Sequence, residues 1–128
     1  MSAFSDALAV TASALKSQAA RLRVVSENVA NVDTPGYRRK TVPFELVRTD
    51  SISQVSPGDV RLSDAELERI HDPSHPMADE TGHYKGSNVN MIIEMADARE
   101  AQRSYEANLK MFEQTRQMSS SLSELLRR

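Results

Sequence analysis

The sequence predicts a mainly α-helical protein in which long N-terminal and C-terminal helices pair as a coiled coil around a short middle segment of loops and strands. Apolar residues follow a 4-3 spacing near both ends, which is the pattern of a helix that packs along one stripe. All five prolines and all four glycines lie between Pro35 and Gly86. We therefore expect an N-terminal helical segment at 1–34, an irregular middle at 35–87, and a C-terminal helical segment at 88–128.

The first helix is predicted from its stripe, which spans about four heptads. Small residues flank the stripe and allow a neighbouring helix to approach closely. Pro35 and Gly36 force the helix to end, since proline lacks a backbone donor and glycine tolerates positive φ. The stripe consists of Phe4, Leu8, Thr11, Leu15, Gln18, Leu22, Val25, Val29 and Val32.

The second helix is predicted from about Met91 to Leu126, with Asn88 or Asn90 as its N-terminal cap. Its stripe begins with a 4-3 spacing and then drifts toward the 3.6-residue period of a straight helix. The stripe consists of Met91, Met95, Ala98, Gln102, Tyr105, Leu109 and Phe112, followed by Thr115, Met118, Leu122 and Leu125.

The middle segment carries two local signals. Val42, Phe44 and Leu46 alternate as in a short strand, which Pro43 confines to a sheet edge. Residues 63–66, Ser-Asp-Ala-Glu, fit a capping box that would start a short helix. Residues 60–70 fit an extended conformation equally well, so the sequence leaves both alternatives open.

Composition limits the possible functions. With 128 residues the chain is long enough for one modest domain, and it has no cysteine for disulfides or thiolate metal sites. The net charge of −2 gives no general reason to expect nucleic acid binding. No apolar run approaches the roughly 20 residues of a membrane span, so direct membrane insertion is not expected. The first ten residues lack the pattern of a cleaved signal peptide.

Three histidines provide the only candidate metal site. His71, His75 and His83 lie near Asp72 and Asp79, and the first two have the i, i+4 spacing of a helical zinc pair. Prolines at 73 and 76 exclude that helix, and no fourth ligand is evident. We favour solvated loop residues over a small metal-dependent enzyme. No nucleophile elbow or phosphate-binding loop is present either, so we expect no enzyme and no cofactor.

Two further groups have ordinary interpretations. Arg38, Arg39 and Lys40 form a short basic run beside Tyr37, and a solvated turn or a salt bridge with a partner explains it better than nucleic acid or lipid binding. The methionines of the second helix would suit an adaptable groove, but ordinary packing is the more common role. They are Met91, Met95, Met111 and Met118.

The arrangement itself favours an assembly component. A helix pair around an irregular insert buries one stripe and leaves several small-sided and amphipathic faces, which further chains would cover. The alternative is a stand-alone helical adaptor or chaperone of a secretion system, which would be stable as a monomer.

Four sequence blocks resemble bacterial flagellar rod and hook axial proteins. Residues 26–40 resemble their N-terminal motif, in which two asparagines at a helix end precede a Thr-x-Gly-Tyr turn. Residues 72–82, 88–95 and 103–108 are similar to the proximal-rod branch of this family, and together the blocks span nearly the whole chain. The motif residues are Asn28, Asn31, Thr34, Pro35, Gly36, Tyr37, Asp72, Pro73, His75, Pro76, Asn88, Val89, Asn90, Tyr105 and Asn108.

The resemblance implies a structural subunit of the flagellar rod, the drive shaft that transmits torque for motility. It implies export by the flagellar type III apparatus without signal cleavage and assembly in the periplasmic part of the basal body. Its partners would be copies of itself, other rod subunits and components at the base of the basal body. Helix packing would join Phe4, Leu8, Leu15, Leu22, Val25 and Val29 to Met95, Tyr105, Leu109, Phe112, Leu122 and Leu125.

Overall fold

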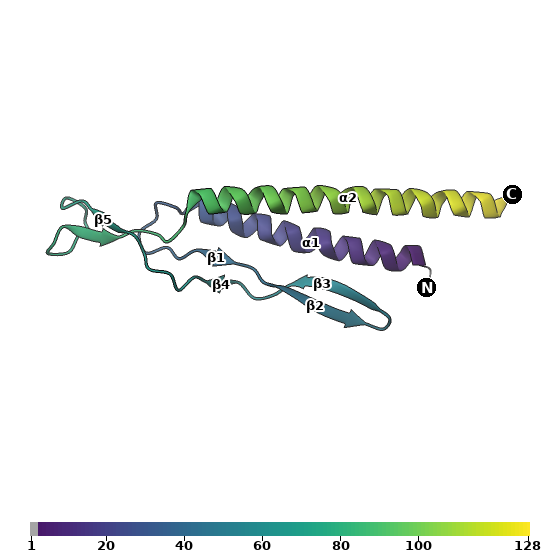
Figure 1. Ribbon diagram of the computed structural model, residues 1–128, viewed down its shortest axis with the longest axis horizontal. Coiled ribbons are helices and arrows are strands. Elements are labelled where there is room, and N and C mark those ends of the chain that lie inside the picture. The colour runs from purple at the N-terminus through teal and green to yellow at the C-terminus, as the bar shows by residue number, and fades with distance from the viewer. Residues whose placement is uncertain (1–2) are drawn as a thin grey trace.

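The computed structural model describes residues 3–128 and contains two long helices with a strand-bearing excursion between them. Helix α1 (Ala3–Ala30) and helix α2 (Met91–Arg127) lie side by side, and both termini lie at the same end of the molecule (Figure 1). The prediction of a mainly helical chain with a short strand-bearing middle is confirmed. The strands are β1 (Lys40–Thr41), β2 (Phe44–Thr49), β3 (Ile52–Pro57), β4 (Arg61–Leu62), β5 (Arg69–His71) and β6 (His83–Lys85).

Helix α1 ends two residues before the last position of its predicted stripe. The Val32 amide donates to the Val29 carbonyl at 3.4 Å, which is a tighter turn than an α-helix makes. The Glu27 carbonyl accepts two hydrogen bonds from Asn31, one from its backbone amide at 3.1 Å and one from its side chain at 2.8 Å. The prediction that Val32 belongs to the helix is therefore wrong.

Helix α2 is capped by Asn90, which decides between the two predicted candidates. Asn90 has an extended backbone, and its side-chain oxygen accepts a hydrogen bond from the Ile92 amide at 3.0 Å. This is the usual geometry of an N-terminal cap. Asn88 instead binds the middle segment, as described below.

The strands form three separate antiparallel pairs, β1 with β4, β2 with β3, and β5 with β6. The β2–β3 hairpin runs along α1 (Figure 1), and the Val55 amide donates to the Ser13 hydroxyl at 3.3 Å. The predicted strand is displaced by two residues, since β2 begins at Phe44 and Val42 lies outside it. Pro43 explains the break, because proline cannot donate to a strand ladder.

Residues 60–70 are extended, so the predicted capping box does not start a helix. The Ser63 amide donates to the Arg39 carbonyl at 2.8 Å, which aligns β4 beside β1. The Arg38 guanidinium donates to the carbonyls of Ser63 and Ala65. These long-range bonds use the backbone groups that a local helix would have needed. Of the two alternatives left open by the sequence, the extended one is confirmed.

The core is small and largely polar. Within the described range, only three apolar residues are buried, and they belong to the two helices. Polar residues outnumber them. A core of this size gives little hydrophobic stabilisation. The buried apolar residues are Val24, Val25 and Ala101, and the buried polar ones are Thr11, Ser17, Asn28, Ser87 and Glu94.

The face of α2 that turns toward α1 is not the predicted apolar stripe. Ala98, Tyr105 and Phe112 are partly buried as expected, but Glu94 and Ala101 are the fully buried members of α2. Met95 and Leu109 are 52% and 37% exposed. Val29, Leu122 and Leu125 are also exposed in the single chain. Their packing against other subunits remains a prediction.

Candidate functional site

The junction where α1 ends and α2 begins is the best-organised part of the molecule. Asn28 is fully buried there, and both ends of its amide are bonded. Its oxygen accepts hydrogen bonds from the Lys40 amide at 2.9 Å and from the Tyr37 hydroxyl at 2.8 Å. Its nitrogen donates to the Lys40 carbonyl at 2.8 Å and to Glu94 at 3.2 Å. One side chain thus joins α1, β1 and α2.

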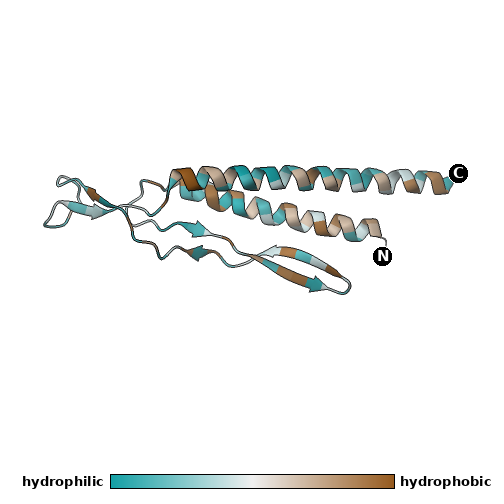
Figure 2. Cartoon of the chain, viewed as in Figure 1, coloured by the Kyte–Doolittle hydropathy of each residue, from teal (hydrophilic) through white to brown (hydrophobic). Residues whose placement is uncertain are grey.

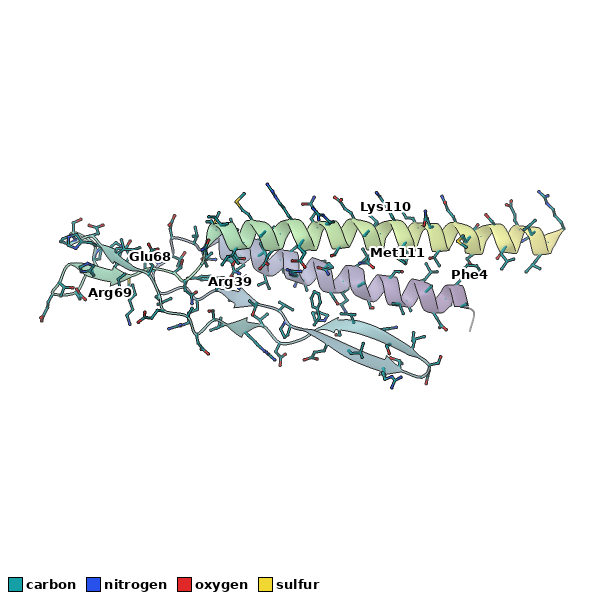
Figure 3. The ribbon with its side chains drawn as sticks, in the orientation of Figure 1. Phe4, Arg39, Glu68, Arg69, Lys110 and Met111 are labelled. Atoms are coloured by element: carbon teal, nitrogen blue, oxygen red, sulfur yellow. The ribbon has the colours of Figure 1, made fainter. Side chains whose placement is uncertain are left out.

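A chain of ion pairs extends from this junction along α2. Glu94 is fully buried and accepts from the guanidinium of Arg39, which also donates to Asp97 at 2.6 Å. Asp97 pairs in turn with Arg21 of α1 at 3.3 Å, and Arg21 also reaches Glu100 at 3.3 Å. Arg39 lies where the strand segment passes beneath the helices (Figure 3). The pairing matters because a buried unpaired carboxylate is strongly destabilising.

The charged groups at the junction shift each other's proton affinity. Burial lowers the pKa of Arg39, but the hydrogen bonds and negative charges of Glu94 and Asp97 outweigh that effect and raise it above its ordinary value. The pKa of Tyr37 is raised by burial and by the charge of Glu27. The pKa of Lys40 is raised mainly by its hydrogen bond to Glu27. All three groups therefore keep their protons at neutral pH.

The turn after α1 positions the residues that enter this junction. The Thr34 hydroxyl donates to the Asn31 side chain at 3.1 Å, and Pro35 follows in the turn. Gly36 has φ +76, which favours glycine, and its amide donates to the carbonyls of Lys85 and Gly86. The turn is thereby fixed to the strand segment that leads into α2.

The segment before α2 closes the junction from the other side. The Asn88 side-chain oxygen accepts from the Arg39 amide, and its nitrogen donates to the Ala65 carbonyl at 3.0 Å. The buried Ser87 hydroxyl donates to the Val32 carbonyl and accepts from the Val89 amide. These contacts join residues 32–39 to 87–89, which are far apart in sequence.

The loop between β5 and β6 lies at the far end from the chain termini (Figure 1). The Asp72 carboxylate accepts hydrogen bonds from the amide and the hydroxyl of Ser74, across the intervening Pro73. The His75 ring stacks on Tyr84, with ring centroids 3.8 Å apart. Gly82 has φ +80, and a Cβ atom there would lie 3.0 Å from Pro73. The loop is therefore a compact, self-bonded unit.

The three histidines weighed as a candidate metal site are not grouped around one point. The rings of His71 and His83 lie 4.7 Å apart, but the His75 ring is engaged with Tyr84. Within residues 3–128, no three His, Asp or Glu side chains are grouped to hold a metal ion. Neither of the two described helices is both long and apolar enough to span a membrane.

We predict that the β5–β6 loop loosens in acid. The pKa of Asp79 falls from 3.8 to about 2, chiefly because its carboxylate accepts from the Thr81 hydroxyl and also from the His83 amide. Since the folded-state pKa is the lower one, ionised Asp79 stabilises the loop above pH 3.8, and this contribution is lost as the pH falls to about 2.

The measurement is an NMR pH titration of the Asp79 carboxyl together with the amides of Thr81 and His83. The control is Asp79→Asn, which keeps an acceptor oxygen but removes the titration. A midpoint at 3.8, the ordinary value, would contradict the prediction.

We also predict that Asn28→Ala destabilises the chain by about 2 to 4 kcal/mol, because it leaves several buried groups without partners at roughly 1 to 3 kcal/mol each. Asn31→Ala is the matched control, since Asn31 bonds only groups near its own helix end. Urea unfolding of both variants and the unchanged chain in trimethylamine oxide, which favours the folded chain, tests the difference when followed by circular dichroism. Equal losses in the two variants would refute the special role of Asn28.

The remaining predicted packing residues lie along the helices. Near the start of α1 and the end of α2 lies an open groove with a volume of about 670 Å³. Phe4 lines it from α1, and Met118, Leu122 and Leu125 line it from α2. Leu8, Leu15 and Leu22 are partly buried, Val25 is fully buried, and Asn108 bonds the Ser104 carbonyl of its own helix. The structure therefore brings Phe4 toward Leu122 and Leu125 but gives Val29 no buried position.

Sequence reasoning missed Arg21, Glu94 and Asp97, which hold the junction together. The signal that could have found Glu94 is a second 4-3 stripe on α2, which has fewer large apolar members than the predicted stripe. This second stripe is Glu94, Ala98, Ala101, Tyr105, Asn108, Phe112, Thr115 and Ser119.

Comparison with known proteins decides the family. Residues 8–38 match the family model described as flagella basal body rod protein, and residues 80–125 match that described as flagellar basal body rod FlgEFG protein C-terminal. The chain is 43% identical to the flagellar basal-body rod protein FlgC of Agrobacterium fabrum, over 99% of this chain and 98% of that protein. This chain belongs to the FlgC family of flagellar basal-body rod proteins.

More distant FlgC proteins agree with this assignment. The FlgC of Aquifex aeolicus is 34% identical over 88% of this chain and 90% of its own length. That of Salmonella typhimurium is 32% identical over 85% and 87%. The two family models cover most of α1 with its exit turn and nearly all of α2, which are the elements joined at the junction. As a FlgC-family member, the chain is a structural rod protein of the flagellar basal body.

Proposed function

We propose that this chain is a subunit of the proximal part of the rod, where it assembles with copies of itself and with other rod proteins. The rod transmits torque for motility. The observation that carries the proposal is the full-length similarity to FlgC of Agrobacterium fabrum. The paired helices add physical support, because a shaft under torsion requires long elements that pack laterally against neighbours.

Exposed apolar residues on the helices support packing into an assembly. Leu125 and Leu126 are 65% and 80% exposed at the end of α2, and Ile92 is exposed at its start. Figure 2 shows that the first turns of α2 are its most hydrophobic stretch. Exposed apolar residues gather at each end of α2, with Ile93 beside Ile92 and Leu126 beside Leu125, and such groups mark interaction sites. We infer that coiled-coil packing of the terminal helices is completed by neighbouring subunits.

The same proposal gives the location of the subunit and its route to the rod. The subunit would leave the cell body through the flagellar type III export apparatus without a cleaved signal peptide. It would then join the periplasmic rod near the components at the base of the basal body.

Deletion of the gene tests the function. The expected result is loss of flagella and of swimming, with both restored by a plasmid copy of the gene. Fractionation provides the second readout, in which the protein co-purifies with basal bodies. A protein that stays in the cytosol of the complemented strain, together with normal swimming of the deletion strain, would instead support a helical adaptor.

We predict that the dilute monomer has weak helicity. The small polar core contributes little hydrophobic stabilisation, and isolated helices are marginal in water. Circular dichroism of the purified chain across a concentration series measures this. A fully helical monomer that melts sharply at low concentration would argue against folding coupled to assembly.

A further inference from the structure

Helix α2 carries two overlapping 4-3 stripes that share Ala98, Tyr105, Phe112 and Thr115. The apolar stripe adds Met95 and Leu109, and the polar one adds members such as Glu94 and Ala101. At 100° per residue, the centres of the two stripes are roughly 60° apart around the helix axis. Helix α2 therefore has two alternative faces that it can present to α1.

Hydrophobic burial alone favours the apolar stripe, yet the structure buries the other one. Glu94 and Ala101 are both 0% exposed, whereas Met95 and Leu109 are 52% and 37% exposed. Rotating α2 by roughly 60° would bury these larger side chains and release the glutamate to water. Some interaction must oppose that rotation.

The ion pairs of the junction provide the opposing interaction. Glu94 is held by Arg39 from the strand segment and by Asn28 from α1. Asp97, one turn along, is held by Arg39 and by Arg21 of α1. The contacts come from two separate elements and all act on one side of α2, so rotation would break them together. The Arg39 guanidinium would then remain in the partly buried junction without its carboxylate partners, which is unfavourable.

We propose that Arg21, Arg39, Glu94 and Asp97, together with Asn28, form a rotational lock that selects the polar stripe of α2 for contact with α1 and keeps Met95 and Leu109 facing outward. A buried polar group that fixes helix register at a cost in stability is known from coiled coils. Here the network sets the rotation of a helix. The lock is a property of the single chain and does not depend on the proposed function.

Thiol reactivity tests the lock, because the chain has no cysteine and each introduced thiol is unique. Ala101→Cys reports the buried polar stripe, and Met95→Cys and Leu109→Cys report the outward apolar stripe. Each is made in the otherwise unchanged chain and in the Arg39→Leu/Glu94→Leu background, which removes both charges together. Alkylation is followed in trimethylamine oxide, which favours the folded chain, after circular dichroism establishes that the helices are formed.

In the unchanged background, we expect alkylation at position 101 to be at least tenfold slower than at 95 and 109. In the double-leucine background, we expect the order of alkylation rates to invert. The cysteines at positions 95 and 109 should be protected, and the cysteine at position 101 should react. An unchanged order in a helical double variant would overturn the proposal, since packing alone would then set the rotation. General reactivity with loss of helix would also overturn it, because the network would then hold the fold rather than select a face. Equal alkylation rates at positions 95, 101 and 109 in the unchanged helical background would also overturn the proposal.

Discussion

Replacing Arg39 with alanine is expected to destabilise the folded chain by about 3 to 5 kcal/mol, because it leaves a buried carboxylate without its charged partner. Glu94 is fully buried, and the guanidinium of Arg39 is the cation that contacts it. Asn28 would still donate to Glu94, but an amide cannot neutralise the charge. The same substitution also removes one of the two arginines that contact Asp97.

A loss of this size approaches the whole stability of a small domain. The expected readout is therefore loss of most of the helical circular dichroism signal at concentrations where the unchanged chain is folded, with recovery in trimethylamine oxide. Arg99→Ala is the matched control, because Arg99 lies on the exposed side of α2 and should change stability by at most about 0.5 kcal/mol. A folded Arg39→Ala chain with control-like stability would refute the role assigned to the ion pair.

Placing two carboxylates at Leu125 and Leu126 is expected to abolish swimming while leaving the fold of the single chain intact. Both side chains are largely exposed, so the chain itself loses little when they are replaced. If neighbouring subunits cover them in the rod, each aspartate would carry an unpaired charge into an apolar contact, which is costly.

The design compares Leu125→Asp/Leu126→Asp with Ser120→Asp/Ser123→Asp in the deletion strain. The serine pair lies on exposed positions of the same helix and adds the same charge. Swimming-ring diameters should fall to the deletion background for the leucine pair and stay near normal for the serine pair. Near-normal swimming of the leucine-pair strain would show that this end of α2 has no partner in the rod.

The fold could be predicted in outline because its main signals are local. The apolar periodicity at both ends and the confinement of proline and glycine to the middle suffice to place two helices around an irregular segment. The end of α1 lies two residues before its predicted position because the helix tightens into a turn at Val32, and β2 starts two residues late because Pro43 interrupts the strand. The choice between a helix and an extended chain at 60–70 depends instead on long-range bonds to residues 38 and 39.

The candidate site was predicted only in part. Asn28, Gly36, Tyr37 and Asn88 stood out by their resemblance to a family motif, and the structure brings all four to one junction. Arg39 appeared only as a member of a basic run. Its partners in α2 lie more than fifty residues away, and no local pattern joins them.

The sequence by itself determined the two long helices, the irregular middle and, through its motifs, the flagellar rod family. The helices and the irregular middle depend on local periodicity and on the backbone limits of proline and glycine. The family depends on motif residues that can be compared one by one with those of known proteins. Only the tertiary structure decided which face of α2 meets α1. That choice depends on Glu94, whose charge is tolerated inside the junction because Arg39 and Asn28 reach it from distant parts of the chain.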